Sequence, residues 1–342
     1  MKFKVLFGSF ITGALLTGAA SAAELRIGII GCDTSHVPAF AAIFNDPKTP
    51  GYIPGGKIVA AFKGGSPDFP QSAKRVDGIA NTLQEKFGVK FYDTIPDLCS
   101  NVDAILLESV DGRVHLEQSR QVIAAHKPLF IDKPMAASLA DVAEIFQLAK
   151  AAKVPIWSAS SLRFGKDSQA VHAGQIGEVQ RAETYSPLEI GEHHPELFFY
   201  GIHGVESLFT VMGTGCETVQ RLTTTNGAVE VIGTWRGGRT GIYRQDLAKK
   251  YHGTAEGLKG KASVGTYDGY EPLALAIMKF FQTGQAPVKP EETMEIFAFM
   301  AAAQESKENG GVVVRLGEVM AKMRQQAVIT PHESVKVVAN EH

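Results

Sequence analysis

Short apolar runs alternate with longer amphipathic segments through the first half of the chain. The apolar runs predict buried strands of a parallel sheet at residues 25–31, 57–62, 103–107, 129–131 and 154–158. The segments between them carry apolar positions at helical spacing and predict helices at residues 36–45, 71–87, 114–125 and 138–152. Because such alternation is typical of a doubly wound α/β sheet, we expect a Rossmann-type domain here.

The pattern changes after Ser160. Longer β-rich runs predict strands at residues 179–186, 217–225, 229–236 and 240–245, mixed with helices at residues 200–212, 272–282 and 290–307. A mostly antiparallel open sheet with flanking helices fits this half. We therefore expect a Rossmann-type domain at residues 24–159 and an α+β domain at residues 160–342.

The first 23 residues have the pattern of a signal peptide. Lys2 and Lys4 precede an apolar run at residues 5–16, and the small residues Ala20-Ser21-Ala22 suit signal peptidase. A membrane anchor is the alternative reading, but the apolar run is short and ends in a cleavage pattern. With no twin-arginine pair, we expect export by the general secretory route to the periplasm or beyond it.

Composition narrows the class of ligand. The 342 residues are 44% hydrophobic and 20% charged, with a formal net charge of −2, which is typical of a globular protein without a nucleic-acid partner. The three cysteines form no C-x-x-C pair, so neither a disulfide framework nor a zinc ribbon is expected. A small molecule is the expected ligand, and no membrane contact is expected after cleavage of the signal peptide.

The first predicted strand ends in an altered glycine turn. Gly28 and Gly31 lie where a Rossmann unit presents backbone N–H groups to a pyrophosphate, but Asp33 and His36 stand at the second and third glycine positions. The Asp33 carboxylate would repel a pyrophosphate. Two readings stay open: a nucleotide-binding turn, or a remodelled turn that binds another polar ligand. Four residues could serve either, namely Asp33, Thr34, Ser35 and His36.

The second predicted strand lacks the expected carboxylate for the ribose hydroxyls. Lys63 follows this strand instead, and with Ser66 it could accept the 2′-phosphate of NADP. A solvated surface lysine is the alternative. The cofactor could therefore be NAD or NADP.

Two further predicted strands end in groups that suit catalysis. Asp132, Lys133 and Pro134 end a buried strand at the carboxyl edge of the sheet, where Lys133 can face a substrate hydroxyl and a nicotinamide. A surface Asp-Lys pair is the alternative. Glu108 and Ser109 end the preceding predicted strand and are expected near the nicotinamide side.

With these features in order, the chain resembles the Gfo/Idh/MocA family, named for glucose-fructose oxidoreductase and inositol dehydrogenase. The Glu-Lys-Pro motif of that family is similar to Asp132-Lys133-Pro134. A second match near the end of the chain comprises Tyr270-Glu271-Pro272, Phe280, Gly284, Ala286-Pro287 and Ser306. The resemblance implies an NAD(P)-binding Rossmann domain followed by an α+β domain whose open sheet could form homo-oligomers.

The resemblance also implies residues of the substrate site. The segment 199–206 resembles the family segment that supplies a catalytic histidine, which implies His203 in that role with Tyr200 beside the substrate. Family dehydrogenases often carry an aspartate four residues earlier, where this chain has Phe199, so Glu206 is the candidate to orient His203 instead. Arg163 is expected either to hold a substrate oxygen or to form an interdomain salt bridge.

The segment at residues 192–196, Glu-His-His-Pro-Glu, is rich in groups that bind metals. Together with His203 and Glu206 it permits a metal site. Adjacent histidines rarely both reach one ion, so we expect no metal and instead assign His194 to the recognition of a substrate hydroxyl.

These observations lead to two hypotheses. The first is an exported oxidoreductase that transfers a hydride between NAD or NADP and a sugar, a polyol or a related carbohydrate, with Lys133 and His203 handling the proton. The second is a protein of the same fold that has lost nucleotide dependence and binds a carbohydrate derivative or catalyses a non-redox reaction. Because an exported protein meets little free dinucleotide, the first hypothesis requires a tightly held cofactor.

Overall fold

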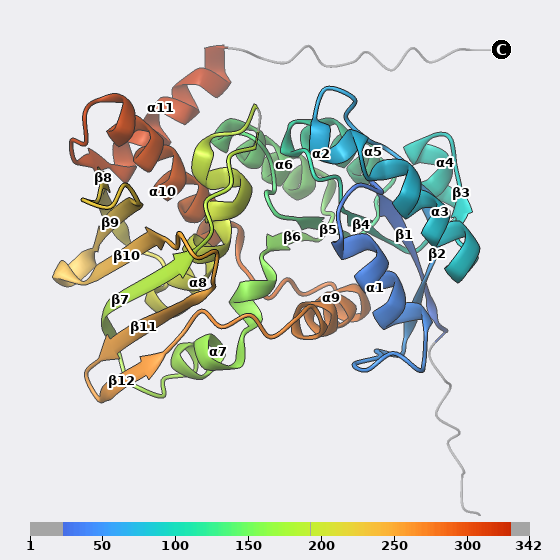
Figure 1. Ribbon diagram of the computed structural model, residues 1–342. Helices are drawn as coiled ribbons and strands as arrows, with labels where there is room; N and C mark the ends of the chain where they lie inside the picture. The colour runs from blue at the N-terminus through green and yellow to red at the C-terminus, as the bar shows by residue number, and fades with distance from the viewer. Residues whose placement is uncertain (1–22, 192, 330–342) are drawn as a thin grey trace, which may run out of the picture.

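The computed structural model describes residues 23–191 and 193–329, so residues 1–22 of the predicted signal peptide lie outside the described residues. Its first sheet has six parallel strands in the order β3-β2-β1-β4-β5-β6 (Figure 1). These strands are β1 (Leu25–Ile30), β2 (Gly56–Phe62), β3 (Lys90–Phe91), β4 (Ala104–Leu107), β5 (Leu129–Asp132) and β6 (Ile156–Ala159). The order runs outward from β1 in both directions, which confirms the predicted doubly wound sheet.

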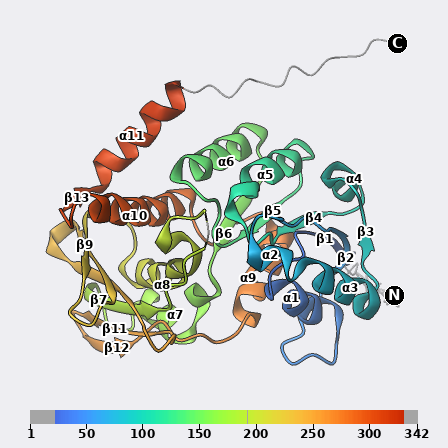
Figure 2. The ribbon, with the colours of Figure 1, turned by 45° about the horizontal axis from the view of Figure 1, so that its top comes forward.

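Helices cover both faces of this sheet (Figure 2). One face carries α1 (His36–Asn45), α3 (Val76–Phe87) and α9 (Glu271–Thr283), and the other carries α4 (Ile95–Ser100), α5 (His115–Ala124) and α6 (Leu139–Ala152). The strands between them are buried on both sides, which explains their continuous apolar sequences. A short helix, α2 (Pro70–Ala73), precedes α3 where the sequence predicted one helix over residues 71–87.

The second sheet has seven strands in the order β12-β11-β7-β10-β9-β8-β13. They are β7 (Val179–Ser186), β8 (Cys216–Thr223), β9 (Val229–Trp235), β10 (Thr240–Gln245), β11 (His252–Gly257), β12 (Gly260–Ser263) and β13 (Val314–Arg315). The β7–β10 pair is parallel and the other pairs are antiparallel, so the prediction of a mostly antiparallel sheet is confirmed.

One apolar helix connects the second sheet to the helices beside it. α8 (Ile202–Met212) is buried along its whole length and continues a π-helical turn at Leu197–Gly201. It contacts β7 and β10 as well as α7 (Lys166–His172) and α10 (Pro290–Glu308). The last described helix, α11 (Leu316–Ile329), packs on α10. α8 therefore has a fixed position, and the polar groups at its start are fixed with it.

Helix α9 crosses back to the first domain. Its residues Leu273, Ile277 and Phe280 are buried in the same apolar cluster as Ile29 of β1 and Phe40 of α1. The sequence placed this helix among the elements of the second half, but the first domain needs it to cover one face of its sheet (Figure 2). The two halves are therefore joined through a shared core as well as by chain connections.

In the described ranges, residues 23–191 and 193–329, no helix has both the length and the apolar character needed to cross a membrane.

Candidate active site

The carboxyl ends of β1, β2 and β4 meet closely at the turn after β1. Gly31 has a φ of +90°, and a Cβ added there would lie 2.4 Å from the backbone nitrogen of Ser109. Gly64, with a φ of +63°, approaches the Gly31 backbone from the end of β2. Glycine is required at position 31 both for its left-handed conformation and for this close approach.

Asp33 fills the space beyond this turn. Its side chain is buried, and its two oxygens accept hydrogen bonds from the Ser72 hydroxyl at 2.6 Å and from the Val110 backbone N–H at 2.9 Å. Burial raises the pKa of Asp33, although these two bonds oppose the rise. The carboxylate thus links the ends of β1 and β4 across the crevice in which a Rossmann fold binds its dinucleotide.

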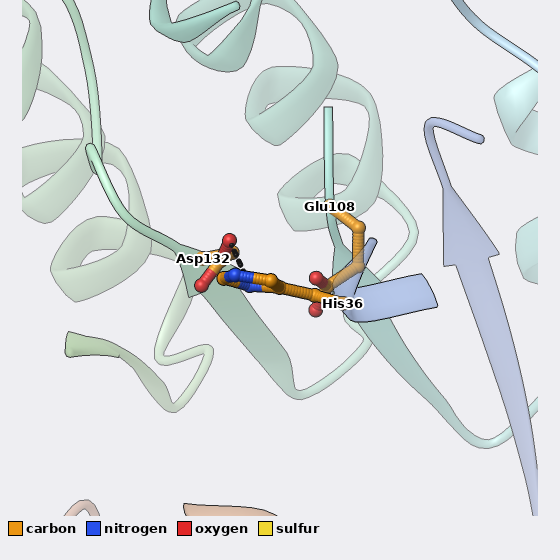
Figure 3. Close-up of side chains that lie close together, drawn as sticks. All are labelled: His36, Glu108 and Asp132. Carbon is orange, nitrogen blue, oxygen red and sulfur yellow. Dashed lines mark ion pairs between the residues drawn. The ribbon is translucent and has the colours of Figure 1, made fainter. Parts of the chain in front are cut away.

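Three buried side chains converge beside this crevice (Figure 3). His36 lies at the start of α1, Glu108 follows β4, and Asp132 ends β5, and one ligand-type atom from each lies within 4.8 Å of the others. His36 Nδ1 is 2.7 Å from Asp132 Oδ2, yet their angles are not those of a hydrogen bond. No local pattern in the sequence joins these residues, because they come from three distant segments of the chain.

Lys133 follows Asp132 directly and lies in a buried pocket beside two aromatic rings. Its ammonium is 5.1 Å from the centre of the Tyr200 ring and 5.7 Å from that of Phe199. Burial lowers the pKa of Lys133, whereas the neighbouring Asp132 and Glu108 oppose this change. An amine with a lowered pKa can exchange a proton more readily near neutral pH.

His203 lies one turn into the segment that the π-helix begins. Its Nδ1 is 2.7 Å from the hydroxyl oxygen of Ser160, and that oxygen also accepts the backbone N–H of Leu162. Burial lowers the pKa of His203 well below its usual value, and the nearby Lys133 and His36 lower it further. The ring is therefore neutral near pH 7 and is oriented by Ser160, a residue that the sequence did not single out.

Lys133 and His203 line the same cavity, which has a volume of about 120 Å³. Several residues expected at the site also line it, namely Thr34, Ser35, His36 and Tyr200. The lining residues that were not expected there include Gln71, Arg75, Tyr251, Tyr267 and Tyr270. No sequence pattern marks the three tyrosines as site residues, because they come from loops of the second half and only the fold brings them over the first sheet.

The other residues expected at a cofactor site lie outside this cavity lining. Gly28 packs within β1, where an added Cβ would come within 2.9 Å of Ile105. Lys63 forms an ion pair with Asp77 of α3, and the Ser109 hydroxyl donates to Gln118. Two further expected residues are also absent from the lining, Ser66 and Pro134.

Three expected substrate residues have protein partners instead. Arg163 is buried and pairs with Glu206 of α8 and Glu292 of α10, each at 2.7 Å. Glu206 thus contacts Arg163, while Ser160 takes the orienting position beside His203. His194 is buried, and its Nε2 accepts the backbone N–H of Gly112 at 3.0 Å. These contacts fix the cavity walls.

The histidine-rich segment does not assemble as the alternative metal reading required. His193 is exposed and Glu196 forms ion pairs with Arg221 and Lys307, while residue 192 lies outside the described residues. Among the residues that the structure describes, the one group with metal-ligand geometry is His36, Glu108 and Asp132.

Comparison with known proteins identifies the first domain. Residues 25–160 match the Gfo/Idh/MocA oxidoreductase family, whose domain is an NAD-binding Rossmann fold. The match spans the first domain, which is less than half of the chain. No curated protein matches the whole sequence.

Solved structures extend the similarity to the second half. The chain is similar to an apo scyllo-inositol dehydrogenase from Lactobacillus casei, with a TM-score of 0.69, 15% identity, and coverage of 87% of this chain and 100% of that one. A second similar structure is a myo-inositol dehydrogenase from the same organism in complex with NAD(H) and myo-inositol. Its TM-score is 0.67 at 15% identity, with coverage of 86% of this chain and 97% of that one. A myo-inositol 2-dehydrogenase from Lactobacillus plantarum has a TM-score of 0.66 at 17% identity, with coverage of 86% of this chain and 99% of that one. The two-domain fold is thus that of known dehydrogenases.

The family implies a dinucleotide, and the crevice retains only part of its cradle. Gly31 keeps the backbone close approach, but the buried Asp33 carboxylate occupies the second glycine position and opposes a diphosphate. The cavity of about 120 Å³ is smaller than the roughly 300–1,000 Å³ of pockets that bury drug-sized ligands. The turn after β1 therefore keeps the close backbone approach of a dinucleotide-binding turn and places a carboxylate where the second glycine would stand.

Proposed function

We propose that this protein is an enzyme of its oxidoreductase family that acts on a hydroxyl group of a small polyol or sugar. The observation that carries the proposal is the shared cavity of Lys133 and His203, two groups able to handle a proton, on a fold common to inositol dehydrogenases. The surrounding tyrosines, with Gln71 and Arg75, offer both donors and acceptors. Such a lining suits a polyhydroxylated ligand.

The two proton-handling groups have different roles in this proposal. Ser160 accepts from Leu162, so its own hydrogen can be donated to His203 Nδ1 and the ring hydrogen then lies on Nε2. His203 would donate this hydrogen to the substrate oxygen and hold it in place. Lys133, whose pKa is lowered by burial, would take the proton that leaves the hydroxyl group.

The family makes a nicotinamide dinucleotide the expected hydride acceptor, since related structures include a dehydrogenase with NAD(H) and myo-inositol. A second candidate is a non-redox acid–base reaction, or carbohydrate binding alone, in the same cavity. Asp33 favours this candidate, because a buried carboxylate in the glycine turn opposes a diphosphate.

Cofactor binding separates the two candidates. Native mass spectrometry of the isolated protein, followed by calorimetric titration with NAD and NADP, would detect a retained or an added dinucleotide. We expect a bound dinucleotide, and reduction of added NAD or NADP in the presence of a polyol such as myo-inositol. A protein that neither retains nor binds either dinucleotide would exclude the redox candidate and leave the non-redox one.

Substitution of the two cavity groups tests their roles. We expect Lys133→Ala and His203→Ala to lower turnover by about 100-fold or more, since general acid–base groups contribute on the order of 10²–10⁴-fold. Lys150→Ala, on the exposed side of α6, is the matched control and should retain turnover. Turnover that survives loss of Lys133 would remove it from the proposal.

We further propose that the protein is exported and self-associates. The signal-peptide pattern supports export to the periplasm or beyond, and the open second sheet supports a homo-oligomer. Light scattering after size exclusion would measure the subunit number, and N-terminal sequencing of the exported protein would find cleavage after Ala22 or Ala23. A monomer, or an uncleaved N-terminus, would overturn the corresponding proposal.

A further inference from the structure

The cluster of His36, Glu108 and Asp132 has no role in the proton chemistry proposed above. It lies at the carboxyl ends of β4 and β5 and at the start of α1 (Figure 3). We propose that these three side chains bind one divalent cation of the first transition series, such as Zn²⁺ or Mn²⁺.

Glu108 gives the first independent argument. Its side chain is 0% exposed, and neither carboxylate oxygen has a hydrogen-bond partner among the described residues. A buried carboxylate without hydrogen bonds is strongly unfavourable unless it is protonated, paired or bound to a metal. Asp33 is equally buried but has hydrogen-bond partners on both oxygens. Glu108 therefore stands out from its neighbour as a group that lacks its ligand.

The contact between His36 and Asp132 gives a second argument. His36 Nδ1 and Asp132 Oδ2 approach to 2.7 Å without hydrogen-bond angles, and Asp132 Oδ1 has no hydrogen-bond partner among the described residues. Two ligand-type atoms this close together can bind one cation. The three ligand atoms lie within 4.8 Å of one another. Two metal–ligand bonds of about 2.1 Å can span about 4.2 Å, so this limit is a few tenths of an ångström too long. Small side-chain rotations close this gap.

The local charge fits a dication. Three buried carboxylates, those of Asp33, Glu108 and Asp132, face one buried ammonium, that of Lys133. The carboxylates outnumber the ammonium, and a divalent cation would offset the repulsion among them. The same charge opposes the diphosphate of a dinucleotide, so one feature accounts for both the altered glycine turn and the cation site.

The donor types select the class of metal. One imidazole nitrogen with two carboxylates suits Zn²⁺ or Mn²⁺ better than Ca²⁺, which prefers six to eight oxygen ligands. Three protein ligands also leave coordination positions open, as in catalytic zinc sites. Because His36 lines the cavity that Lys133 and His203 share, these positions would face a bound hydroxyl compound.

The test measures metal content directly. The isolated protein is treated with a chelator, desalted and incubated separately with Zn²⁺, Mn²⁺ and Mg²⁺, and bound metal is counted by elemental mass spectrometry. We expect one Zn²⁺ or Mn²⁺ per chain and a higher unfolding temperature with metal. Glu108→Gln and His36→Ala should each weaken binding by more than about tenfold.

A matched variant controls for the loss of a buried glutamate. Glu295 Oε1 accepts the backbone N–H groups of Gly215 and Cys216, and glutamine at 295 can keep both bonds. Glu295→Gln should bind metal like the unmodified protein. No metal on the unmodified protein, or equal binding by Glu108→Gln, would overturn the proposal. Since the count requires no substrate or dinucleotide, this result is independent of the proposed enzymatic activity.

Discussion

At the scale of single residues, the candidate site depends on a buried histidine that lies near a buried lysine. His203 is 5% exposed, and its pKa is lowered by burial and by the nearby Lys133 and His36. Ser160 satisfies its Nδ1 with a hydroxyl group rather than a carboxylate, so no negative charge favours protonation. The folded protein thus holds this ring neutral, which is the state needed to donate a single hydrogen to a substrate oxygen.

This neutral state makes the stability of the protein depend on pH. Below about pH 6.5 the unfolded chain binds a proton at His203 and the folded chain does not, so the free energy of unfolding falls as the pH falls. Between about pH 7.5 and about pH 5.5, we expect the free energy of unfolding of His203→Asn to fall by about 1.4 kcal/mol less than that of the unmodified protein. Urea unfolding at the two pH values measures the difference. Equal losses in the two proteins would show that His203 is protonated when folded.

The residue scale also marks the limit of sequence reasoning at the site. Lys133 and His203 could be predicted because each belongs to a local motif that resembles a known family. The Ser160–His203 contact and the His36–Asp132 approach join segments far apart in the chain, and no local pattern contains them. Arg163 was expected to hold a substrate oxygen or to form an interdomain salt bridge, and Glu206 was expected to orient His203. In the structure these two side chains are buried between helices and pair with each other, a contact that no local pattern shows.

At the scale of single elements, two glycines allow Trp235 to lie flat against the second sheet. Gly233 of β9 and Gly241 of β10 are cross-strand partners, and Trp235 passes over both. An added Cβ would lie 2.5 Å from the Trp235 ring at position 233 and 2.6 Å from it at position 241. The indole N–H donates to the Gly213 carbonyl at 2.8 Å, which fixes the ring at this position.

We expect Gly241→Ala to destabilise the protein, because the new methyl group and the Trp235 ring cannot occupy the same space. Overpacking of this kind costs about 1–3 kcal/mol. Gly317→Ala in α11, where no other atom lies within 4 Å of the added Cβ, should be neutral or slightly stabilising. Chemical denaturation of both variants measures the difference, and equal stability would mean that the indole can shift at little cost.

Most strands and helices could be predicted from periodicity alone, and those that could not have a physical reason. β7 and β10 were predicted with their observed bounds, since β-rich sequence coincides with one buried face. The β11–β12 hairpin was missed because its strands contain several glycines and few large apolar residues. β3 and β13 have two residues each, too short for any periodic signal.

At the scale of the whole molecule, the two domains share a core. Phe280 of α9 is fully buried, and its ring centre is 6.0 Å from that of Trp157 in β6. Nothing in the sequence separates α9 from its neighbours along the chain, because an apolar helical face does not indicate which sheet it covers. The arrangement predicts that neither domain unfolds independently.

We expect Phe280→Ala to lower the free energy of unfolding by about 3–5 kcal/mol while the protein still unfolds in one transition. Leu275, on the same helix but 59% exposed, is the matched control, and its replacement by alanine should change stability by about 0.5 kcal/mol or less. Calorimetry and circular dichroism together test cooperativity. Two separate transitions would show that α9 does not couple the domains.

The return of α9 also sets an order of events during synthesis. The strands of the first sheet are complete at Ala159, yet part of one face, which α1 and α3 do not cover, stays uncovered until residues 271–283 have been made. A nascent chain that pauses before this helix presents an apolar surface built around β1 and α1. Rapid completion of the chain, or a chaperone that shields this surface in the meantime, is therefore a requirement for producing the protein in soluble form.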